Sequence, residues 1–376
     1  MSISAYDHER LQQTLQLARQ AVGLTDPNPR VGCVIDSADG HHRFSGHTQA
    51  VGGAHAEAVA LGEARAAGMA LHGATAWVSL EPCAHHGRTP PCCDALVEAG
   101  IGRVVVATTD PNPLVAGQGI ERLRAAGVTV ELADRATASA ARELNIGFFS
   151  RMQRRRPWVR MKIAATLDGR TALENGLSQW ITGEAARTDG HRWRQRASAL
   201  LTGIGTVLED NPRLDVRLVP AARQPLRVIV DSRLQTPADA RILDAPGEVL
   251  IYAAVGDAAS EQALRERGAQ IERRPDSRGK VDLAAMLDDL TRREINELHV
   301  EAGHKLNASL LRAGLVDELL VYMAPKLLGL GREMAAFGPL QSLDEALPFE
   351  FTQVERIGPD LRILARPPGR ADFLDN

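Results

Sequence analysis

The chain has 376 residues, of which 44% are hydrophobic and 24% are charged, and its formal net charge is −3. At ~100–200 residues per domain, this length predicts two or three domains, and the composition is that of a globular protein with enough apolar residues for more than one core. The slightly negative charge and an aromatic content of 4% disfavour binding of nucleic acid or anionic membranes through basic patches and stacked rings.

The cysteines and the N-terminus indicate a reducing compartment. Four cysteines are too few for a disulfide scaffold in a chain of this length, and three of them fall between positions 83 and 93, beside several histidines. In a reducing compartment this pattern is typical of metal binding. Residues 1–10 lack the apolar core of a secretory signal, and no apolar run reaches the ~18–20 residues that cross a bilayer. We therefore expect a cytoplasmic protein.

Apolar periodicity in the first part of the chain alternates between helix and strand. The predicted elements are helices at 7–23, 54–67, 92–99 and 119–126, and strands at 30–36, 74–80, 103–108 and 128–132. Another helical stretch ends near Phe149. Alternation of this kind predicts an α/β sheet with helices on its faces.

One histidine and two cysteines form a pattern that is typical of catalytic zinc. His55 and Glu57 make a His-x-Glu pair, and Cys83 follows a proline ahead of Cys92. One imidazole and two thiolates fill three corners of the tetrahedron that zinc prefers, which leaves the fourth for water. Zinc lowers the pKa of that water, and Glu57 is placed to carry its proton to a leaving amine. We predict a zinc-dependent deaminase of a pyrimidine-type ring.

Two features of this pattern leave alternatives. Eight residues separate Cys83 from Cys92, where the plain tRNA- or cytidine-deaminase motif has two. A structural zinc site would take a fourth ligand, and His85, His86 or Cys93 would each supply one. Cys92 begins a predicted helix, whose N-terminus would favour its thiolate. Cys93 is interpreted as a bystander and Cys33 as a core residue.

The chain divides near residue 150. The basic run Arg151–Arg156 is closed by a proline, and we interpret it as a solvated connector rather than a phosphate or nucleic-acid site. Beyond it the α/β alternation restarts. Predicted strands lie at 158–165, 226–231, 248–253, 297–301 and 317–323, and predicted helices at 184–197, 260–267, 282–292 and 304–313.

The second half lacks the Gly-x-Gly-x-x-Gly fingerprint of dinucleotide-binding folds. A glycine-rich turn at 202–206 follows an apolar strand at 198–201, and residues 301–309 form a second strand-to-helix junction. Each is a weak signal alone, and the first reads equally as a tight turn. Two such junctions in one domain predict a dinucleotide cleft at the C-terminal ends of strands, where backbone N–H groups bind phosphate.

Several segments in order resemble the bifunctional riboflavin-biosynthesis deaminase/reductase family. In the first half these are 25–32, 55–57, the expanded 82–92 loop and 109–113; in the second half they are 161–170, 178–182, 203–212 and 301–303. The resemblance covers nearly the whole chain. It implies a zinc-dependent deaminase domain at 1–148 with a cytidine-deaminase-like α/β/α sandwich. A linker at 149–157 and an NADPH-dependent reductase domain at 158–376, an α/β fold like dihydrofolate reductase, complete the chain.

For the deaminase half, the resemblance implies hydrolytic deamination of a diamino-hydroxypyrimidine that carries a phosphoribosylamino group. Its zinc ligands are His55, Cys83 and Cys92, with Glu57 as the catalytic acid and base. The residues implied on the substrate side are Asn28, His47, His85, Arg88, Asp110 and Asn112. The two asparagines lie in Pro-Asn-Pro turns, and shaping those turns is the alternative role for both; His47 reads equally as a surface histidine.

For the reductase half, the resemblance implies hydride transfer from NADPH that opens the ribose to a ribityl chain. The residues implied for NADPH are Ala164, Trp180, Thr206, Asp210, Ser232, Gly303, His304, Lys305, Leu306, Asn307, Ala308 and Ser309. Those implied for the substrate are Ser178, Arg194, Leu214, Arg217 and Glu301.

Some reductase assignments have simpler readings. Lys162, with Glu301 or Asp210 nearby, is the residue we expect to polarise or protonate the ring oxygen, although a structural ion pair explains it as well. Arg194 and Arg217 read equally as surface charges. Asp215 stands where the family often has threonine, which bears on the substrate contacts there.

We therefore expect a bifunctional enzyme that uses Zn²⁺ and NADPH on small phosphoribosyl pyrimidines, with no nucleic acid or membrane partner. We also expect a homo-oligomer, a dimer or tetramer, although the sequence does not give the state. The alternative is a nucleic-acid-editing zinc deaminase with an RNA-binding C-terminal domain. It predicts basic grooves and stacking aromatics, for which this composition gives little support.

Overall fold

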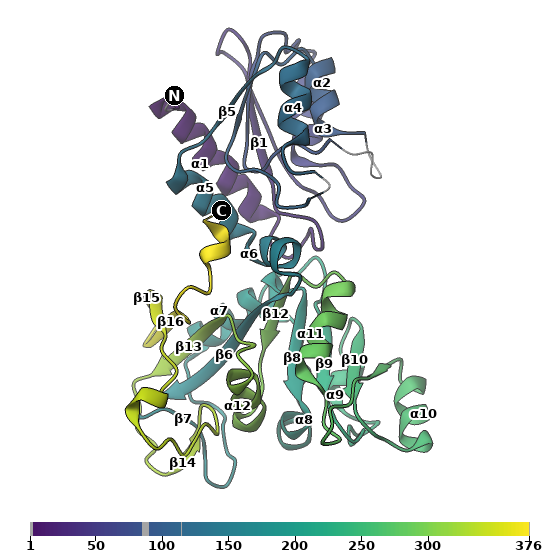
Figure 1. Cartoon of the computed structure of the whole chain (residues 1–376), viewed down its shortest axis with the longest axis vertical. Coiled ribbons are helices and arrows are strands. Elements are labelled where there is room, and N and C mark those ends of the chain that lie inside the picture. Colours follow the sequence, from purple (N-terminus) through teal and green to yellow (C-terminus); the bar gives the residue numbers. More distant parts are fainter. Residues whose placement is uncertain (1–2, 85–89, 114, 376) are drawn as a thin grey trace. The chain divides into compact units, whose positions relative to one another are not determined.

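A computed structural model describes residues 3–84, 90–113 and 115–375 of the chain (Figure 1). The chain forms two compact units. The first contains the residues up to Arg155 together with those from Phe373 onward, and the second runs from Arg156 to Asp372. Among the described residues, no helix combines the length and apolar character needed to span a membrane.

The first unit is built on a five-stranded mixed sheet. Its strands are β1 (Gly32–Asp36), β2 (Arg43–His47), β3 (Thr75–Val78), β4 (Arg103–Val106) and β5 (Thr129–Leu132), in the order β2-β1-β3-β4-β5. β1 runs antiparallel to both β2 and β3, whereas β3, β4 and β5 are parallel. The carboxyl ends of β2, β3 and β4 therefore meet the start of β1 at one edge of the sheet.

Helices cover both faces of this sheet. They are α1 (Ala5–Gln20), α2 (Ala56–Ala66), α3 (Cys92–Glu98), α4 (Gln118–Ala125), α5 (Arg135–Leu144) and α6 (Ile146–Phe149), followed by a π-helical turn at Ser150–Arg154. Figure 1 shows α1 beside α5, and α2, α3 and α4 grouped together. On the α1 side, apolar residues of α1 and α5 pack on Trp77 and Val105 of the sheet. The result is an α/β/α sandwich, as predicted.

The second unit is built on a nine-stranded sheet in the order β11-β10-β9-β8-β12-β6-β13-β16-β15. These strands are β6 (Trp158–Thr166), β8 (Ala199–Gly203), β9 (Leu226–Val230), β10 (Val249–Ala253), β11 (Gln270–Arg273), β12 (Glu297–Val300), β13 (Glu318–Ala324), β15 (Glu350–Ile357) and β16 (Asp360–Arg366). The first seven strands in this order are parallel to one another. β16 runs antiparallel to β13, and β15 runs antiparallel to β16. A separate ribbon pairs β7 (Arg170–Leu173) with β14 (Gly331–Glu333).

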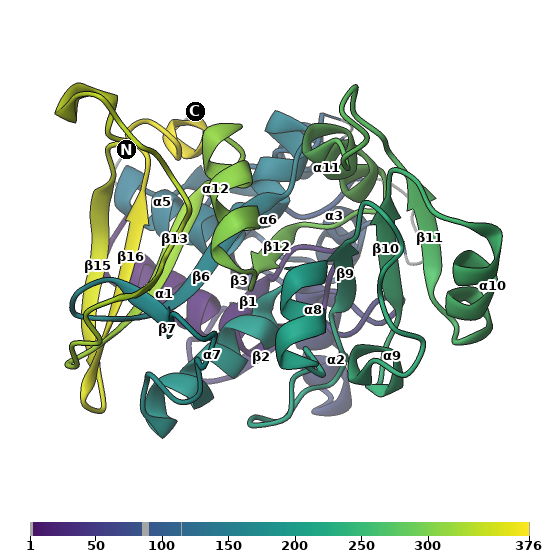
Figure 2. The same ribbon diagram turned by 90° about the horizontal axis from the view of Figure 1, so that it is seen from below.

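Two layers of helices enclose the large sheet (Figure 2). They are α7 (Glu184–Arg196), α8 (Ile204–Asp210), α9 (Arg241–Asp244), α10 (Ala258–Glu266), α11 (Leu283–Arg292) and α12 (His304–Arg312). Leu287 of α11 and Leu310 of α12 belong to one apolar cluster with alternate residues of β6, β8, β9 and β12. Ile242 of α9 and Leu264 of α10 pack on the opposite face of β8, β9 and β10. The sequence predicted the α/β alternation that produces this layering.

The structure also departs from the sequence-based expectations. β2, β7, β11, β14 and the C-terminal β15–β16 hairpin were not predicted. β2 contains Gly46, where a Cβ atom would lie 2.4 Å from the backbone oxygen of Ala56, so the strand carries glycine because α2 crosses it closely. The expected tight turn at 202–206 is wrong, because β8 continues to Gly203 and α8 begins at the next residue.

The basic run joins the two units, because their boundary falls between Arg155 and Arg156, but most of its residues are half-buried and make specific contacts, so the expected full solvation is wrong. Arg151 donates to the backbone oxygen of Pro27 at 3.2 Å. The Arg154 guanidinium lies 4.8 Å from the centre of the Phe373 ring, which brings the end of the chain back to the first unit. Arg156 donates to Asp317 at 3.2 Å within the second unit.

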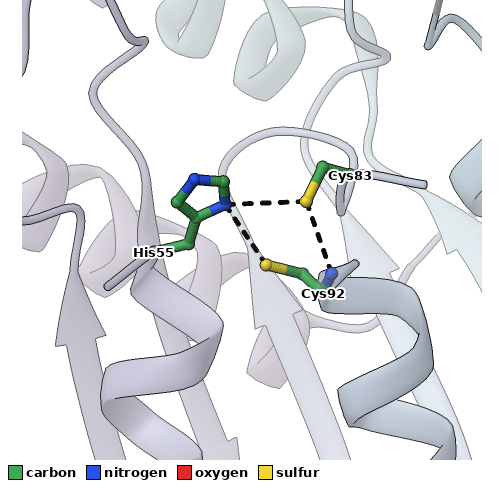
Figure 3. Close-up of side chains that lie close together, drawn as sticks. All are labelled: His55, Cys83 and Cys92. Atoms are coloured by element: carbon green, nitrogen blue, oxygen red, sulfur yellow. Dashed lines mark hydrogen bonds between the residues drawn. The ribbon is translucent and has the colours of Figure 1, made fainter. Parts of the chain in front are cut away.

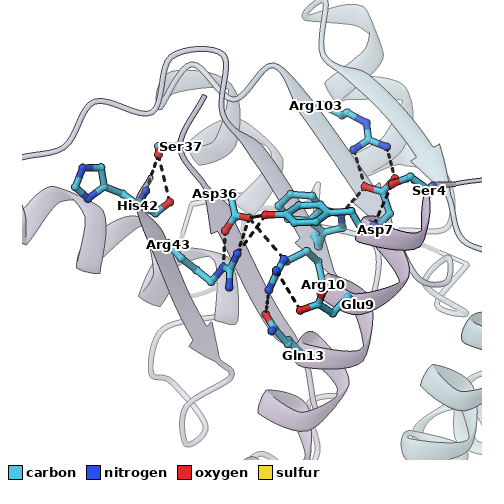
Figure 4. A network of polar contacts seen from close by, with 12 residues as sticks. Ser4, Asp7, Glu9, Arg10, Gln13, Asp36, Ser37, His42, Arg43 and Arg103 are labelled. Carbon is cyan, nitrogen blue, oxygen red and sulfur yellow. Dashed lines mark hydrogen bonds and ion pairs between the residues drawn. The ribbon is translucent and has the colours of Figure 1, made fainter. Parts of the chain in front are cut away.

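A buried carboxylate fixes α1 against the sheet of the first unit (Figure 4). Asp7 forms a capping box with Ser4, accepts a bond from Trp77 Nε1 at 2.9 Å and pairs with Arg103 at 2.7 Å. Burial opposes ionisation, but hydrogen bonds from Arg103, Ser4 and Trp77 outweigh it and hold the pKa of Asp7 well below its ordinary value. Asp7 therefore links α1 to β3 and β4 as an anion.

We expect Asp7→Asn to lower the free energy of unfolding by about 2 kcal/mol at neutral pH, because it removes charge-assisted bonds to Arg103. A depressed carboxyl pKa stabilises the fold above the unfolded pKa of about 3.9, and that contribution is lost as pH falls below it. Urea unfolding of wild type and variant between pH 7 and pH 2 should therefore show the difference shrinking in acid. Exposed Glu98→Gln serves as the control. A difference that stays constant with pH would contradict the ion-pair account.

Candidate metal centre and reductase cleft

The predicted deaminase residues gather because the topology brings strand ends together. Cys83 follows β3 at its carboxyl end, and Asp110 follows β4 at the same edge. His47 ends β2 and pairs with Gly32, the first residue of the antiparallel β1. Polar side chains from the ends of three strands, β2, β3 and β4, are thus placed at one edge of the sheet, where α2 and α3 begin.

Three side chains at this edge form a compact cluster (Figure 3). His55 is the N-cap residue of α2, Cys92 is the first residue of α3, and Cys83 follows β3. The His55 Nδ1 atom lies 3.6 Å from Cys83 Sγ and 3.3 Å from Cys92 Sγ. The three ligand atoms all lie within 4.8 Å of one another, and no other such cluster of His, Cys, Asp and Glu occurs among the described residues.

This geometry fits zinc. Zinc–sulfur bonds of about 2.3 Å and zinc–nitrogen bonds of about 2.0–2.1 Å at tetrahedral angles separate nitrogen from sulfur by about 3.6 Å. The distance from His55 Nδ1 to Cys83 Sγ, 3.6 Å, equals this value, and the distance to Cys92 Sγ, 3.3 Å, is slightly shorter. The described residues supply three ligands, which is the number found in catalytic rather than structural zinc sites.

Hydrogen bonds prepare Cys83 as the thiolate of the pair. The Cys92 side chain contributes most, and with His55 and the Cys92 backbone N–H it lowers the pKa of the Cys83 thiol against the opposing effect of burial. The Cys92 N–H lies 3.3 Å from Cys83 Sγ. The first N–H of α3 therefore stabilises charge on Cys83, where the sequence pointed to Cys92 itself.

Glu57 lies in the first turn of α2 and is 3% exposed. Burial, with the nearby charge of Cys83, raises the pKa of the Glu57 carboxyl to about 7. A carboxyl with a pKa near working pH both accepts and releases a proton readily, as general acid–base catalysis requires. Cys93 and Cys33 are buried and lie outside the ligand cluster.

The predicted substrate residues of the first unit differ in how deeply they are buried. Burial raises the pKa of Asp110 to about 6, and its carboxylate accepts the Asn112 N–H at 2.8 Å. Asn28 is half-buried in a turn closed by its N–H bond to the Thr25 oxygen at 2.9 Å. His47 is also half-buried. Two further predicted residues, His85 and Arg88, lie outside the described residues.

One buried acid at this edge was missed by the sequence analysis. Glu81 is 4% exposed and directly precedes the Pro-Cys pair. Its carboxylate accepts four backbone N–H groups, those of Asp110, Gly117, Gly119 and Ile120, at 2.9–3.2 Å. It therefore binds the segment after β4 and the start of α4 to the end of β3. In the sequence, only its position close to Cys83 could have pointed to Glu81, because the backbone groups that it binds lie 29 to 39 positions away.

The second unit contains a cleft of about 1430 Å³ at the carboxyl ends of β8, β9 and β12. Seven of the predicted NADPH residues line it: Thr206, Ser232, Gly303, His304, Lys305, Leu306 and Ser309. Gly303 is the N-cap of α12 and offers no side-chain cap, so the first N–H groups of that helix are available to a ligand. The two weak signals of the sequence thus lie in one cleft that fits a dinucleotide.

The other predicted NADPH residues do not line this cleft. Asn307 and Ala308 are buried, and Asn307 donates to the backbone oxygen of Met334 at 2.9 Å. Trp180 is 62% exposed under the guanidinium of Arg187. Ala164 is half-buried in β6. Burial, with the nearby charge of Glu209, raises the pKa of Asp210.

A second group of charges lies on the opposite face of β6 and β12 from the α11–α12 core. Glu301 follows β12, pairs with Arg194 of α7 through both carboxylate oxygens and lies 3.5 Å from Lys162. Burial opposes ionisation of Glu301, but Arg194 and Lys162 outweigh it and hold its pKa well below the ordinary value. Glu301 is therefore an anion that orients two cations, and Arg194 is no surface charge.

The remaining predicted substrate residues extend this group. Arg217 is partly exposed and pairs at 2.7 Å with Asp215, the residue that stands in place of the family's common threonine. Its backbone N–H donates to His191 Nδ1 at 3.1 Å. Burial, with Arg194 and Arg217 nearby, lowers the pKa of His191 to about 4, so it accepts this bond as a neutral ring. Leu214 is buried with a φ of 49°.

Family models match both units. Residues 5–108 match the cytidine and deoxycytidylate deaminase zinc-binding region. Residues 157–363 match the RibD C-terminal domain, which covers more than half of the chain. Neither match depends on the other, and each falls on the unit where the corresponding site lies.

Curated relatives match over nearly their full length. The riboflavin biosynthesis protein RibD of Escherichia coli is 43% identical over 368 residues, covering 94% of this chain and 98% of the relative. That of Aquifex aeolicus is 39% identical, covering 96% and 98%.

Solved structures agree with these relatives. Acinetobacter baumannii RibD has a TM-score of 0.85 at 39% identity, covering 96% of this chain and 98% of the other. The diaminohydroxyphosphoribosylaminopyrimidine deaminase/5-amino-6-(5-phosphoribosylamino)uracil reductase of Thermotoga maritima has a TM-score of 0.84 at 32% identity, with the same coverage. The predicted fold class, a deaminase-like domain followed by a reductase domain, is confirmed.

We expect Glu81→Gln to lower the free energy of unfolding by about 2–3 kcal/mol, because the amide NH₂ replaces one of two oxygens that accept backbone N–H groups. Loosening of the segment after β4 should also raise the KM of the deaminase reaction. Thermal melts and the rate of ammonia release measure these two effects, and NADPH oxidation by the second unit is expected to stay unchanged. The matched control is Glu121→Gln, an exposed residue of α4, the helix whose start Glu81 binds. Unchanged stability would show that the four N–H bonds are dispensable.

Proposed function

The chain belongs to the RibD family of bifunctional riboflavin biosynthesis enzymes, and from that premise we propose which of its residues carry out the two reactions. The protein is a zinc-dependent deaminase joined to an NADPH-dependent reductase. A nucleic-acid-editing deaminase needs an RNA-binding C-terminal domain, and the reductase match at 157–363 leaves no place for one.

For the deaminase, His55, Cys83 and Cys92 would hold the zinc ion, and Glu57 is the catalytic acid and base. Bound zinc supplies an activated water at neutral pH. Glu57 accepts a proton from that water and delivers it to the ring amine, which leaves as ammonia while oxygen takes its place. A carboxyl with a pKa of about 7 suits both halves of this exchange. This buried acid beside a three-ligand cluster is the observation that carries the proposal.

The substrate of this half is a diamino-hydroxypyrimidine that carries a phosphoribosylamino group. In the proposal, Asn28, His47, Asp110 and Asn112 contact it, since they lie at the strand ends that hold the zinc ligands. His85 and Arg88 complete the set, and the Arg88 cation would face the phosphate. Glu81 acts through Asp110 and is a positioning residue.

For the reductase, Lys162 is the proposed proton donor and the cleft between β8, β9 and β12 the proposed NADPH site. NADPH supplies a hydride when bound. Lys162 would give a proton to the ribose ring oxygen as the bond from the anomeric carbon to that oxygen breaks. Glu301 remains ionised between Lys162 and Arg194, so it orients the lysine rather than donating a proton itself. Ser178, Arg194, Leu214 and Arg217 would bind the substrate, with Ala164, Trp180 and Asp210 beside the cofactor.

Self-association into a dimer or tetramer is part of the proposal. β15 is the edge strand of the nine-stranded sheet, and Phe351 and Val354 on it are 73% and 54% exposed. An edge strand with exposed large apolar side chains is a surface that a second copy would cover.

We expect Glu57→Gln to reduce ammonia release from the phosphoribosyl pyrimidine at least about 100-fold while zinc content stays at one ion per chain, because the amide keeps the shape but moves no proton. Metal analysis and an ammonia assay measure the two quantities. Turnover that survives the substitution contradicts the assigned role.

Two adjacent cysteines provide the control for the metal. Cys92→Ser should lose the zinc, because it removes one of three ligands, whereas Cys93→Ser should retain it. Zinc that survives in Cys92→Ser would place the ion on other ligands.

We expect Lys162→Gln to reduce NADPH oxidation at least about 100-fold with the deaminated product as substrate. Lys162 is partly exposed and Glu301 keeps its pair with Arg194, so folding should be preserved. Ammonia release by the deaminase unit of the same variant is the internal control, and NADPH binding should be unchanged. A kcat equal to that of the wild type would reduce Lys162 to a structural ion pair.

A further inference from the structure

The reductase cleft is lined by more cations than its carboxylates neutralise. Six lysine and arginine side chains line it: Arg233, Arg278, Lys280, Lys305, Arg312 and Arg332. Arg278 pairs with Asp276 and Arg332 with Glu209, and Arg312 donates to a backbone oxygen. Within the described part of the chain, Arg233, Lys280 and Lys305 have no carboxylate partner.

The acidic residues of the cleft are already engaged. Besides Arg278, Asp276 accepts the backbone N–H groups of residues 278 and 280, each at 2.8 Å. Asp282 caps α11 by accepting the N–H groups of Ala284 and Ala285 at 3.0 Å. Glu209 is held by Arg332. The uncompensated charge in the cleft is therefore positive, which favours a ligand with several phosphates.

Two of the free cations lie together at one end of the cleft. Arg233 comes two residues after Asp231, which follows β9, and Lys280 lies on the loop that the Pro275–Val281 bridge closes. The Val281 N–H donates to Ser232 Oγ at 3.1 Å, which joins the two segments.

Buried contacts fix the turn that carries Arg233. Asp231 is fully buried and accepts bonds from the Thr236 N–H and hydroxyl at 2.8 Å and from the Arg233 N–H at 3.3 Å. The backbone under Arg233 is thus held before any ligand arrives, while its guanidinium remains free to bind one.

The third free cation, Lys305, lies at the other end of the cleft. Lys305 is in the first turn of α12, whose uncapped N-terminus follows β12. The sheet order β9-β8-β12 separates Ser232 from Gly303 by two strand spacings, about 10 Å. That is the scale of one nucleoside, so one ligand can place phosphates at both ends.

We propose that Arg233 and Lys280 bind the 2′-phosphate on the adenosine ribose of NADPH and make the reductase select NADPH over NADH. This inference rests on the NADPH site of the proposed function and adds the residues that read the one group by which the two cofactors differ. Arginine beside the ribose at a strand end is how nucleotide-binding α/β folds accommodate a 2′-phosphate. Lys305 and the α12 N-terminus bind the pyrophosphate, which both cofactors share.

Calorimetry with the full-length protein tests the assignment. The ligands are NADPH, NADH, adenosine 2′,5′-bisphosphate and AMP, and the variants are Arg233→Gln, Lys280→Gln and the double variant. Each single substitution should weaken NADPH and the bisphosphate about tenfold or more and leave NADH and AMP unchanged, because only the former carry the 2′-phosphate. Both side chains are exposed, so the variants should fold, and thermal melts check this.

Two further variants separate the ends of the cleft. Lys305→Gln should weaken NADPH and NADH by the same factor, because the pyrophosphate is common to both. Arg241→Gln should weaken neither, because Arg241 is exposed at the start of α9 and lies outside the cleft.

Other outcomes overturn the inference. Equal losses for NADPH and NADH in Arg233→Gln and Lys280→Gln would show that the pair holds the dinucleotide without reading the 2′-phosphate, and unchanged binding of all four ligands would place that phosphate elsewhere. A wild-type protein that binds none of the four would contradict the proposed NADPH site itself, which distinguishes that failure from failure of the pair.

Discussion

The first unit depends on a single geometric constraint: three metal-ligand atoms must converge to within 4.8 Å although they come from three segments of the chain. Parallel strands meet this constraint because their carboxyl ends share an edge, and α2 and α3 begin there with His55 and Cys92. Glu81 strengthens the same edge by holding four backbone N–H groups. The fold thus brings the three-residue cluster, the proposed proton carrier Glu57 and Glu81 to one edge of the sheet.

The second unit uses buried charge to align the strands that carry its chemistry. Arg160 of β6 lies between Glu297 of β12 and Glu318 of β13, and all three are almost fully buried. Arg196 pairs with Glu297 and Arg366 with Glu318, so no carboxylate is left alone. Removing one partner of such a group costs about 3–5 kcal/mol, whereas replacing the whole group costs little, so the network contributes register more than stability.

That register has a direct consequence for catalysis. Because side chains alternate along a strand, Arg160 and Lys162 of β6 face the same side of the sheet, as do Glu297, His299 and Glu301 along β12. The ion pair between Arg160 and Glu297 therefore also aligns Lys162 with Glu301, which lie 3.5 Å apart. The opposite face of the same strands carries the apolar core beneath α11 and α12. The alternation of side chains along β6 and β12 thus places the apolar core on one face of the sheet and the charged residues on the other.

The sequence by itself predicted the cluster of His55, Cys83 and Cys92, the proposed proton carrier Glu57 and the α/β alternation. These signals are local: His55 and Glu57 are two residues apart, and the periodicity of a helix or strand is contained in a short window. It also predicted that the two strand-to-helix junctions at 202–206 and 301–309 form one dinucleotide cleft, and both line the cleft of the structure.

Only the tertiary structure decided the partners of charged residues. Nothing near Arg194 in the sequence distinguishes it from a surface charge, because its partner Glu301 is 107 positions away. Glu81 binds backbone groups about 30–40 residues on, and Ser232, next to Arg233, accepts the Val281 N–H of the Lys280 loop across 49 positions. A local pattern specifies which residue types are present. Which of them is left with an unpaired charge, and is therefore free to bind a ligand, depends on contacts that form only when distant segments pack together.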